Sequence, residues 1–328
     1  MYEVRRYTAD RADEWNRFVA ASKQGTFLFD RRFMDYHADR FRDHSLLVYR
    51  DQQLYALLPA NEREATLVSH GGLTYGGLLT TSRCSATGVI EVFKAINDYL
   101  HSAGICRVIY KAIPHIYHQQ PAEEDLYALT AVCQARLTIR DISSAIVAPH
   151  RQRFSESRRS GLRKAVKAGL HLCESADVDA FWHILNDNLT QKYAVRPVHT
   201  ADELRLLRSR FPDNIKLWLV FDGDTPIGGT LLFLTPRVLH TQYISANARG
   251  KQLGAIDLLF DHLINHIYCD YPVIDFGKST VSDSADLNSQ LIFQKEGFGA
   301  SAVCYDTYEW EIEHRKLEIE HWRLTIYP

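Results

Sequence analysis

A stretch able to bind an anion lies between residues 238 and 255. Its first eight residues alternate between two faces, as a strand does. A turn with two glycines follows, the second being Gly254, and it also carries the positive charge of Arg249. Glycine-containing turns at the start of a helix leave backbone N–H groups unpaired, and these groups attract anions. The spacing predicts a pyrophosphate site that extends along the end of the strand at Ile244 and Ser245, with a purely structural turn as the alternative.

The neighbouring elements would hold this turn in place. After it, apolar residues recur at helical spacing from Ile256 to Ile267, with polar residues on the other side. A short apolar run over 272–277 contains Asp275 and is followed by Lys278. This order predicts a strand, a turn, a helix and a second strand, that is, αβ units that open where the two strands end.

These motifs resemble the cofactor half of the GNAT acyl-CoA N-acyltransferases. The usual pattern in that family is Gln/Arg-x-x-Gly-x-Gly/Ala, and residues 249–255 read Arg-Gly-Lys-Gln-Leu-Gly-Ala, with Gln252 in place of the central glycine. Residues 293–300, Phe-Gln-Lys-Glu-Gly-Phe-Gly-Ala, are similar to the Phe-Lys-x-Gly-Phe-Gly ending of the Fem-type peptidoglycan-bridge transferases and their acyl-CoA-using relatives. Residues 158–170 resemble the same group, whose members carry two GNAT-like domains.

The resemblance implies transfer of an acyl group from a thioester to an amine. Such a reaction needs a neutral nucleophile, an oxyanion stabiliser and an acid for the leaving thiolate. The backbone from Ile244 to Ala246 is expected to polarise the carbonyl. We expect Tyr243, Ser245 and Asp275 to be the catalytic side chains. His240 is a further candidate for the base, but strict strand alternation places it opposite Tyr243 unless a bulge intervenes.

The donor, acetyl-CoA or another acyl-CoA, is expected to contact the turn and two lysines. The resemblance places Lys295 near the donor phosphates, and Lys278 competes for that role. No metal is expected. The predicted cofactor-binding residues are Ile244, Ala246, Arg249, Gln252, Gly254, Ala255, Lys278 and Lys295.

Length and element order predict two domains. A chain of 328 residues exceeds the size at which one hydrophobic core usually stops growing. Both halves show strands, a glycine-rich turn, a helix and another strand. We therefore expect an α/β (α+β) fold of tandem GNAT-like domains, residues 1–149 and 150–328, each with a mixed, mostly antiparallel central sheet flanked by helices. The first glycine-rich turn has no arginine equivalent to Arg249, so only the second domain is expected to hold acyl-CoA.

Composition limits the class of protein. The formal charge is −2 and the pI is near 6.7, which argues against general nucleic-acid binding. No run of about 18 apolar residues and no signal peptide is recognisable, so we expect no membrane span and a cytoplasmic location. The six cysteines form no Cys-x-x-Cys pair, which disfavours a zinc cluster or a disulfide framework.

Three loops carry candidates for binding the acceptor. The glycine-rich turn at 71–77 follows a short strand, and a loop at 111–118 combines two histidines with a tyrosine. Residues 192–199 correspond to the loop that closes over the acceptor in GNAT relatives, and their basic groups suit an anionic acceptor. This loop leads into Thr200, which begins a helix with a capping-box signature. The candidates are His70, Tyr75, Lys111, His115, Tyr117, Lys192, Arg196 and His199.

Three functions fit these patterns. The leading hypothesis is an acyl-CoA-dependent N-acyltransferase, with acetyl as the favoured acyl group, that acts on an amine of a small molecule or of a sugar or cell-envelope precursor. A Fem-type transferase that takes its aminoacyl group from tRNA is the second, disfavoured because those proteins commonly add a coiled-coil insertion or a larger basic surface. A non-catalytic binding protein with a vestigial GNAT pocket is the third.

Overall fold

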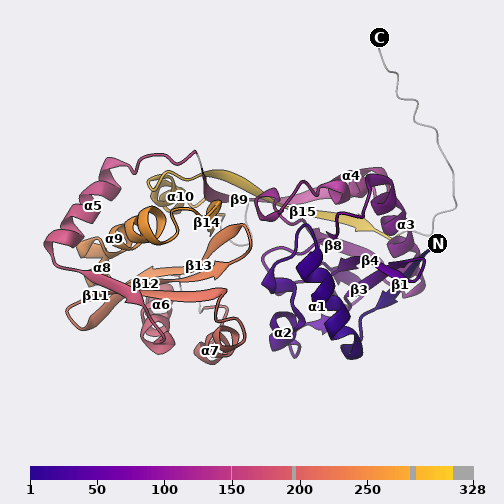
Figure 1. The fold of residues 1–328 in the computed structure, drawn as a ribbon, viewed down its shortest axis with the longest axis horizontal. Helices are drawn as coiled ribbons and strands as arrows, with labels where there is room; N and C mark the ends of the chain where they lie inside the picture. Colours follow the sequence, from indigo (N-terminus) through magenta and orange to yellow (C-terminus); the bar gives the residue numbers. More distant parts are fainter. Residues whose placement is uncertain (149, 194–196, 281–285, 313–328) are drawn as a thin grey trace, which may run out of the picture.

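The chain folds into two lobes joined by two long strands (Figure 1). The computed structural model describes residues 1–148, 150–193, 197–280 and 286–312, without the side chains of 191–193. The joining strands are β9 (Arg136–Val147) and β15 (Ser301–Glu311). No helix in this described part has both the length and the apolar content needed to cross a bilayer.

The N-terminal lobe combines short strands with four α-helices. Its strands are β1 (Tyr2–Arg6), β2 (Arg42–Asp43), β3 (Leu46–Arg50), β4 (Gln53–Leu58), β5 (Asn61–Arg63), β6 (Thr66–Val68), β7 (Leu79–Thr80) and β8 (Arg107–Lys111). Its helices are α1 (Ala12–Ala21), α2 (Arg31–Met34), α3 (Ala86–Ser102) and α4 (Glu124–Ala131), with 3-10 turns η1 (Ala9–Arg11), η2 (Phe27–Phe29), η3 (Asp35–His37) and η4 (His115–Tyr117).

The C-terminal lobe has longer strands. They are β10 (His171–Glu174), β11 (Ile215–Asp222), β12 (Thr225–Leu234), β13 (Val238–Ala246) and β14 (Val273–Lys278). The helices are α5 (Glu156–Lys167), α6 (Val178–Tyr193), α7 (Ala201–Arg210), α8 (Ala248–Leu253), α9 (Ala255–His262) and α10 (Ser289–Glu296), with the π-helical turn η5 (Leu263–Ile267) after α9. The capping box predicted for α7 is confirmed, since Thr200 and Glu203 exchange both hydrogen bonds.

Strands β9 and β15 connect the strands of the two lobes into one continuous sheet. The order of this eleven-stranded sheet is β10-β11-β12-β13-β14-β9-β15-β8-β6-β5-β2, and a second sheet has the order β1-β3-β4-β7. Most described pairs are antiparallel, with β13–β14 and β6–β8 parallel. The predicted fold class is confirmed. The division at residue 149 stays a prediction, and β15, from the second half of the sequence, pairs with β8 of the first lobe.

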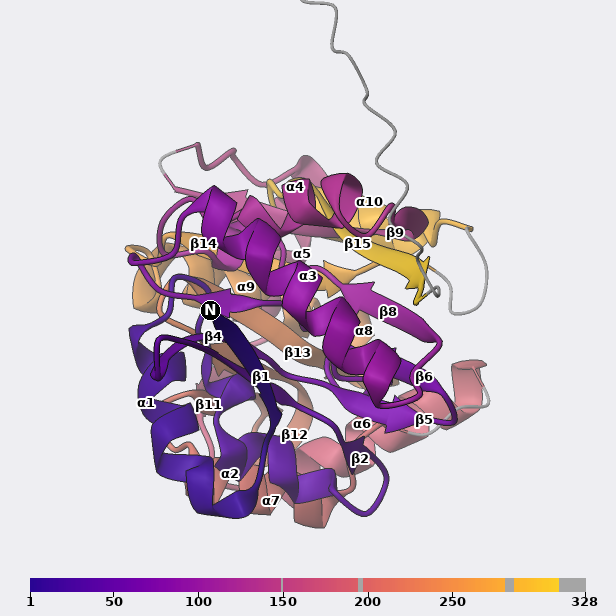
Figure 2. The ribbon, with the colours of Figure 1, turned by 90° about the vertical axis from the view of Figure 1, so that its right-hand side faces the viewer.

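Buried aromatic residues hold the lobes together. Each lobe has its own apolar core, and a third core contains residues of both. The partly buried ring of Phe27 packs against this shared core, 5.3 Å from the ring of Phe211 and 5.4 Å from that of Phe233. Burying one such ring contributes roughly 1.5–3 kcal/mol. Figure 2 shows α3 on the outer face of the N-terminal lobe, so the shared core lies on the opposite side, where the lobes meet.

Candidate active site

The central sheet opens between β13 and β14. The two strands pair in parallel at three positions, from Val238 opposite Val273 to His240 opposite Asp275. Strand β13 then continues to Ala246, whereas β14 pairs with β9 on its other side. Among the described strands, none pairs with the β14-facing edge of β13 beyond His240. The opening expected at the strand ends is therefore present, and it begins at His240.

A β-bulge changes which side chains of β13 share a face. Thr241 pairs with Leu232 and Tyr243 with Leu231, so Gln242 is an extra residue on β13. Tyr243 consequently packs against the core that contains Val238, on the face from which His240 also projects. The strict alternation assumed from the sequence was wrong here, because the bulge shifts its phase.

Asp275 is the centre of a buried hydrogen-bond network. Its side chain is fully buried, and Nδ1 of His240 lies 2.7 Å from Oδ2. The hydroxyls of Tyr117 and Tyr305 donate to the same oxygen at 3.0 and 2.7 Å. The Ser143 hydroxyl donates to Oδ1 at 2.5 Å. These partners come from both lobes and from the two joining strands, so docking of the lobes assembles the network.

The network fixes the charge of the carboxylate and the tautomer of the imidazole. Burial alone would raise the pKa of Asp275, but the hydrogen bond and charge of His240, with bonds from Ser143 and Tyr305, lower it to about 2. Burial raises the pKa of Tyr117 and of Tyr305 well above the usual value, so both remain donors. In the neutral imidazole, a proton on Nδ1 donated to Asp275 leaves the lone pair on Nε2. No described group hydrogen-bonds to Nε2, which leaves it available to a ligand.

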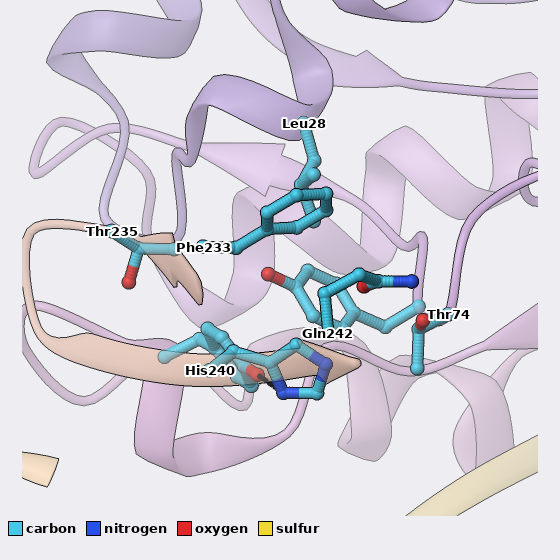
Figure 3. Close-up of a pocket in the computed structure, with 8 residues that line it drawn as sticks. Leu28, Thr74, Phe233, Thr235, His240 and Gln242 are labelled. Carbon is cyan, nitrogen blue, oxygen red and sulfur yellow. Dashed lines mark hydrogen bonds between the residues drawn. The ribbon is translucent and has the colours of Figure 1, made fainter. Parts of the chain in front are cut away.

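A small pocket lies beside this imidazole, between the lobes. It encloses about 250 Å³ of empty space, part of it open to solvent. Figure 3 shows His240 and Gln242 from β13 near Thr74 of the glycine-rich loop, with Leu28 and Phe233 across the pocket. Its lining residues are Leu28, Thr74, Tyr75, Tyr117, Phe233, Thr235, His240 and Gln242. A substrate amine in this pocket would meet Nε2 of His240.

Two of the predicted catalytic side chains are engaged elsewhere. The Tyr243 hydroxyl lies 2.6 Å from Nδ1 of His199, and burial raises its pKa to about 12. The Ser245 hydroxyl is buried and donates to the Ile184 carbonyl at 3.3 Å. Neither residue lines the pocket. Asp275 is in the network, but behind His240, where it positions the imidazole.

The predicted anion-binding turn is folded differently. Helix α8 begins directly after Asn247, whose side chain accepts the Gly250 N–H at 2.9 Å. The next helix, α9, begins after Gly254, and α5 lies across this junction. A Cβ on Gly254 would lie 2.3 Å from the Gly161 carbonyl oxygen. Helix α5 therefore packs closely against Gly254, and contact of Gly254 and Ala255 with a pyrophosphate stays a prediction.

The other predicted donor contacts are spread over several environments. Ile244 is partly buried toward α9, Ala246 is buried and Gln252 is exposed. Arg249 is exposed and its Nε donates to Asp222 at 2.8 Å. Lys278 pairs with Asp141 at 2.5 Å.

Lys295 lies at the end of β14. Its ammonium is buried and donates to the Gly277 and Lys278 carbonyls and to the Ser279 hydroxyl, at 2.7, 3.0 and 2.8 Å. Burial lowers its pKa to about 8, although the charge of Asp275 acts in the opposite direction. The lysine therefore satisfies the carbonyls at the end of β14, and contact with donor phosphates stays a prediction.

Replacing Gly254 by alanine should lower the free energy of unfolding by at least about 2 kcal/mol, because its φ of +80° and the Gly161 carbonyl both oppose a Cβ. Gly223→Ala is the matched control, since φ is also positive (+57°) but no atom lies within 4 Å of the added Cβ. Urea unfolding measures both variants. Equal losses of unfolding free energy in the two variants would show that the contact between α5 and Gly254 does not restrict the side chain at this position.

The predicted acceptor residues separate into two groups. Tyr75 and Tyr117 line the pocket. Near them, burial and the charge of Lys278 lower the pKa of Lys111 to about 7, and its ammonium donates to the Leu73 carbonyl.

The histidine candidates lie outside the pocket lining. His70 is buried, whereas His115 is exposed. Burial lowers the pKa of His199 to about 4, so the expected anion contact would involve a neutral ring. The Lys192 side chain and Arg196 lie outside the described residues.

Sequence reasoning missed the second joining strand. Tyr305 and Ser143 are far from His240 in the sequence, and no local motif marks them. Gln242 was missed because a bulge has no signature in an alternating pattern. The available signal was a carboxylate, Asp275, within the short apolar strand that lies beside the strand carrying His240.

Comparisons with known proteins agree with this architecture. Residues 150–283 match the model of the acetyltransferase (GNAT) domain family. FemX has a similar structure, with a TM-score of 0.66 at 9% identity over 94% of this chain and 97% of that one. L-PGS from Bacillus licheniformis gives 0.59 at 11% identity, covering 92% and 91%. A tandem GNAT protein from the clavulanic acid biosynthesis pathway gives 0.53 at 11% identity, covering 96% and 100%.

Identities this low show a shared fold. No curated protein matches the sequence. The family match and the similar structures confirm the resemblance to GNAT and Fem-like acyltransferases at the level of the fold.

Proposed function

We propose that this chain, whose residues 150–283 match the GNAT domain model, is an N-acyltransferase in which His240 is the general base. The observation that carries the proposal is the pairing of His240 with buried Asp275 beside a pocket between the lobes. A base oriented by a carboxylate, with its second nitrogen free, suits removal of a proton from an amine.

The chemistry assigns a role to each group. The acceptor nitrogen attacks the acyl carbonyl carbon, and a C–N bond forms while the proton on nitrogen passes to Nε2 of His240. The C–S or C–O bond of the donor then breaks, and the leaving sulfur or oxygen takes up the proton. The unpaired edge of β13 after His240 offers backbone N–H groups to the oxyanion. Asp275 stabilises the imidazolium while the proton is on His240.

Two donor classes are supported by different observations. The GNAT domain match supports acyl-CoA, as the sequence motifs also imply. The basic helix α5, which packs against the Gly254 junction, supports the aminoacyl-tRNA alternative because it offers positive charge to tRNA phosphates. In either case the acyl carbonyl must reach His240.

Turnover assays with each donor distinguish these classes. Acetyl-CoA with a panel of primary amines, followed by release of free thiol, tests the first, and a charged tRNA with the same amines tests the second. We expect one donor to give product and to raise the melting temperature. For acetyl-CoA, Arg249→Ala should abolish that shift without unfolding. Failure of both donors with every amine would reject the proposed activity and favour a binding protein.

A further inference from the structure

The pocket beside His240 has a polar side and an apolar side. Gln242, Thr74 and the imidazole lie near one another in Figure 3, and Leu28 and Phe233 lie across from them. Leu28 and Phe233 are only 7% and 3% exposed, so their surfaces are part of the core. A bound amine would therefore have its nitrogen among the polar groups and its stem against the apolar side.

The lining lacks countercharges. None of its residues is Asp, Glu, Lys or Arg, and His240 has already committed Nδ1 to Asp275. A carboxylate or phosphate inside would lose its hydration without a charged partner among these lining residues, which is strongly unfavourable. The pocket is narrow and partly open to solvent, which restricts its occupant to a small ligand with a short stem.

Tyr75 adds a group that the folded protein itself leaves unused. The residue is 2% exposed and lines the pocket, yet its hydroxyl has no hydrogen-bond partner in the described structure. Burial raises the pKa of Tyr75, and the nearby Thr26 hydroxyl lowers it by a smaller amount. The two hydroxyls do not meet the distance and angle of a hydrogen bond, so the Thr26 hydroxyl also has no partner among the described residues. Buried hydroxyls are normally paired, and an uncharged polar atom of a ligand would supply the missing partner.

We propose, on the basis of the function proposed above, that the acceptor is a primary amine on a short apolar stem bearing one uncharged hydrogen-bonding group, which Tyr75 recognises. Gln242 and Thr74 position the nitrogen against His240. Amino alcohols and amides of apolar amino acids belong to this class, whereas free amino acids and phosphorylated amines are excluded.

Three matched amines test this specificity. Valinol has the amine, the apolar stem and a hydroxyl, isobutylamine lacks the hydroxyl, and valine has a carboxylate in its place. Their binding to the full chain is measured by calorimetry without any donor. We expect valinol to bind about 5- to 10-fold more tightly than isobutylamine, because one neutral hydrogen bond usually increases affinity by about that factor. Valine should bind least tightly of the three. Equal or tighter binding of valine would overturn the proposal.

The variant Tyr75→Phe identifies the residue responsible. It should reduce valinol affinity to that of isobutylamine, leave isobutylamine binding unchanged and keep or raise the melting temperature, because an unpaired buried hydroxyl is removed. A lower melting temperature with equal weakening of both amines would instead assign Tyr75 a structural bond to Thr26 and overturn the proposal. Thr74→Val, at a half-buried position, should weaken valinol and isobutylamine by the same factor, and a selective loss of valinol would move the recognition from Tyr75 to Thr74.

Binding without a donor separates this inference from the proposed activity. If valinol binds as expected and no donor supports transfer, the acceptor pocket stands and acyltransferase activity is rejected. If transfer occurs but only to anionic amines, the activity stands and the inferred acceptor class is rejected.

Discussion

Replacing His240 by asparagine should lower kcat for acyl transfer by about 10²- to 10⁴-fold, the usual contribution of a general base. The asparagine amide nitrogen can replace Nδ1 in the bond to Asp275, which His240 makes at 2.7 Å. It offers no equivalent of Nε2, so the network is retained while the base is lost. The measurement is single-turnover transfer with the active donor, and KM for the amine should change little.

His44 provides the matched control. It is also buried and its Nδ1 lies 3.0 Å from a carboxylate, that of Glu62, but it does not line the pocket. His44→Asn should reproduce the structural effect of the substitution and leave kcat unchanged. A His240→Asn protein that kept more than a tenth of the activity would remove His240 from the role of base.

Replacing Asp275 by asparagine should reduce both activity and stability. The side chain accepts hydrogen bonds from Tyr117, Tyr305 and Ser143 in addition to that from His240. Asparagine has one acceptor oxygen, so several buried donors would lose their partner, at a cost of about 3 kcal/mol or more in unfolding free energy. Loss of the carboxylate also frees the imidazole to rotate, and kcat should fall by about 10²- to 10⁴-fold.

The pH dependence of stability gives a second measure of the same residue. The pKa of Asp275 is lowered from 3.8 to about 2 in the folded protein. The ionised carboxylate therefore stabilises the fold above about pH 4, and this contribution is lost as the pH falls toward 2. The free energy of unfolding, measured with urea at each pH, should rise less steeply between pH 2 and 5 in Asp275→Asn than in the parent protein.

Asp125 is the control for this substitution. It is buried against the Tyr110 hydroxyl in the N-terminal lobe, and burial raises its pKa to about 6 despite that hydrogen bond. Its ionisation therefore opposes folding as the pH rises from 4 to 6, the reverse of Asp275. Asp125→Asn should leave kcat unchanged. Equal losses of activity in the two variants would indicate general destabilisation.

Local patterns in the sequence were sufficient for the elements. The alternation of 238–245, the helical spacing after Ile256 and the Thr200 capping box each correspond to a described strand, helix or cap. Such elements depend on residues close in the sequence, two apart in a strand and three or four apart in a helix, so a short window contains the necessary information. The two-lobed GNAT-like fold followed from the order of elements and from motifs with family resemblance.

The site itself depends on contacts that no window contains. Tyr117 and Tyr305 are 188 residues apart and meet at Asp275 only because β15 returns across both lobes. The bulge at Gln242 follows from the register between β12 and β13. The close contact at Gly254 follows from the packing of α5 against it. Residue types and spacing could therefore nominate Asp275 and Tyr117 as candidates. The pairing of His240 with Asp275 could be seen only in the folded sheet, because burial and long-range packing decide which strands become neighbours, and local preferences do not.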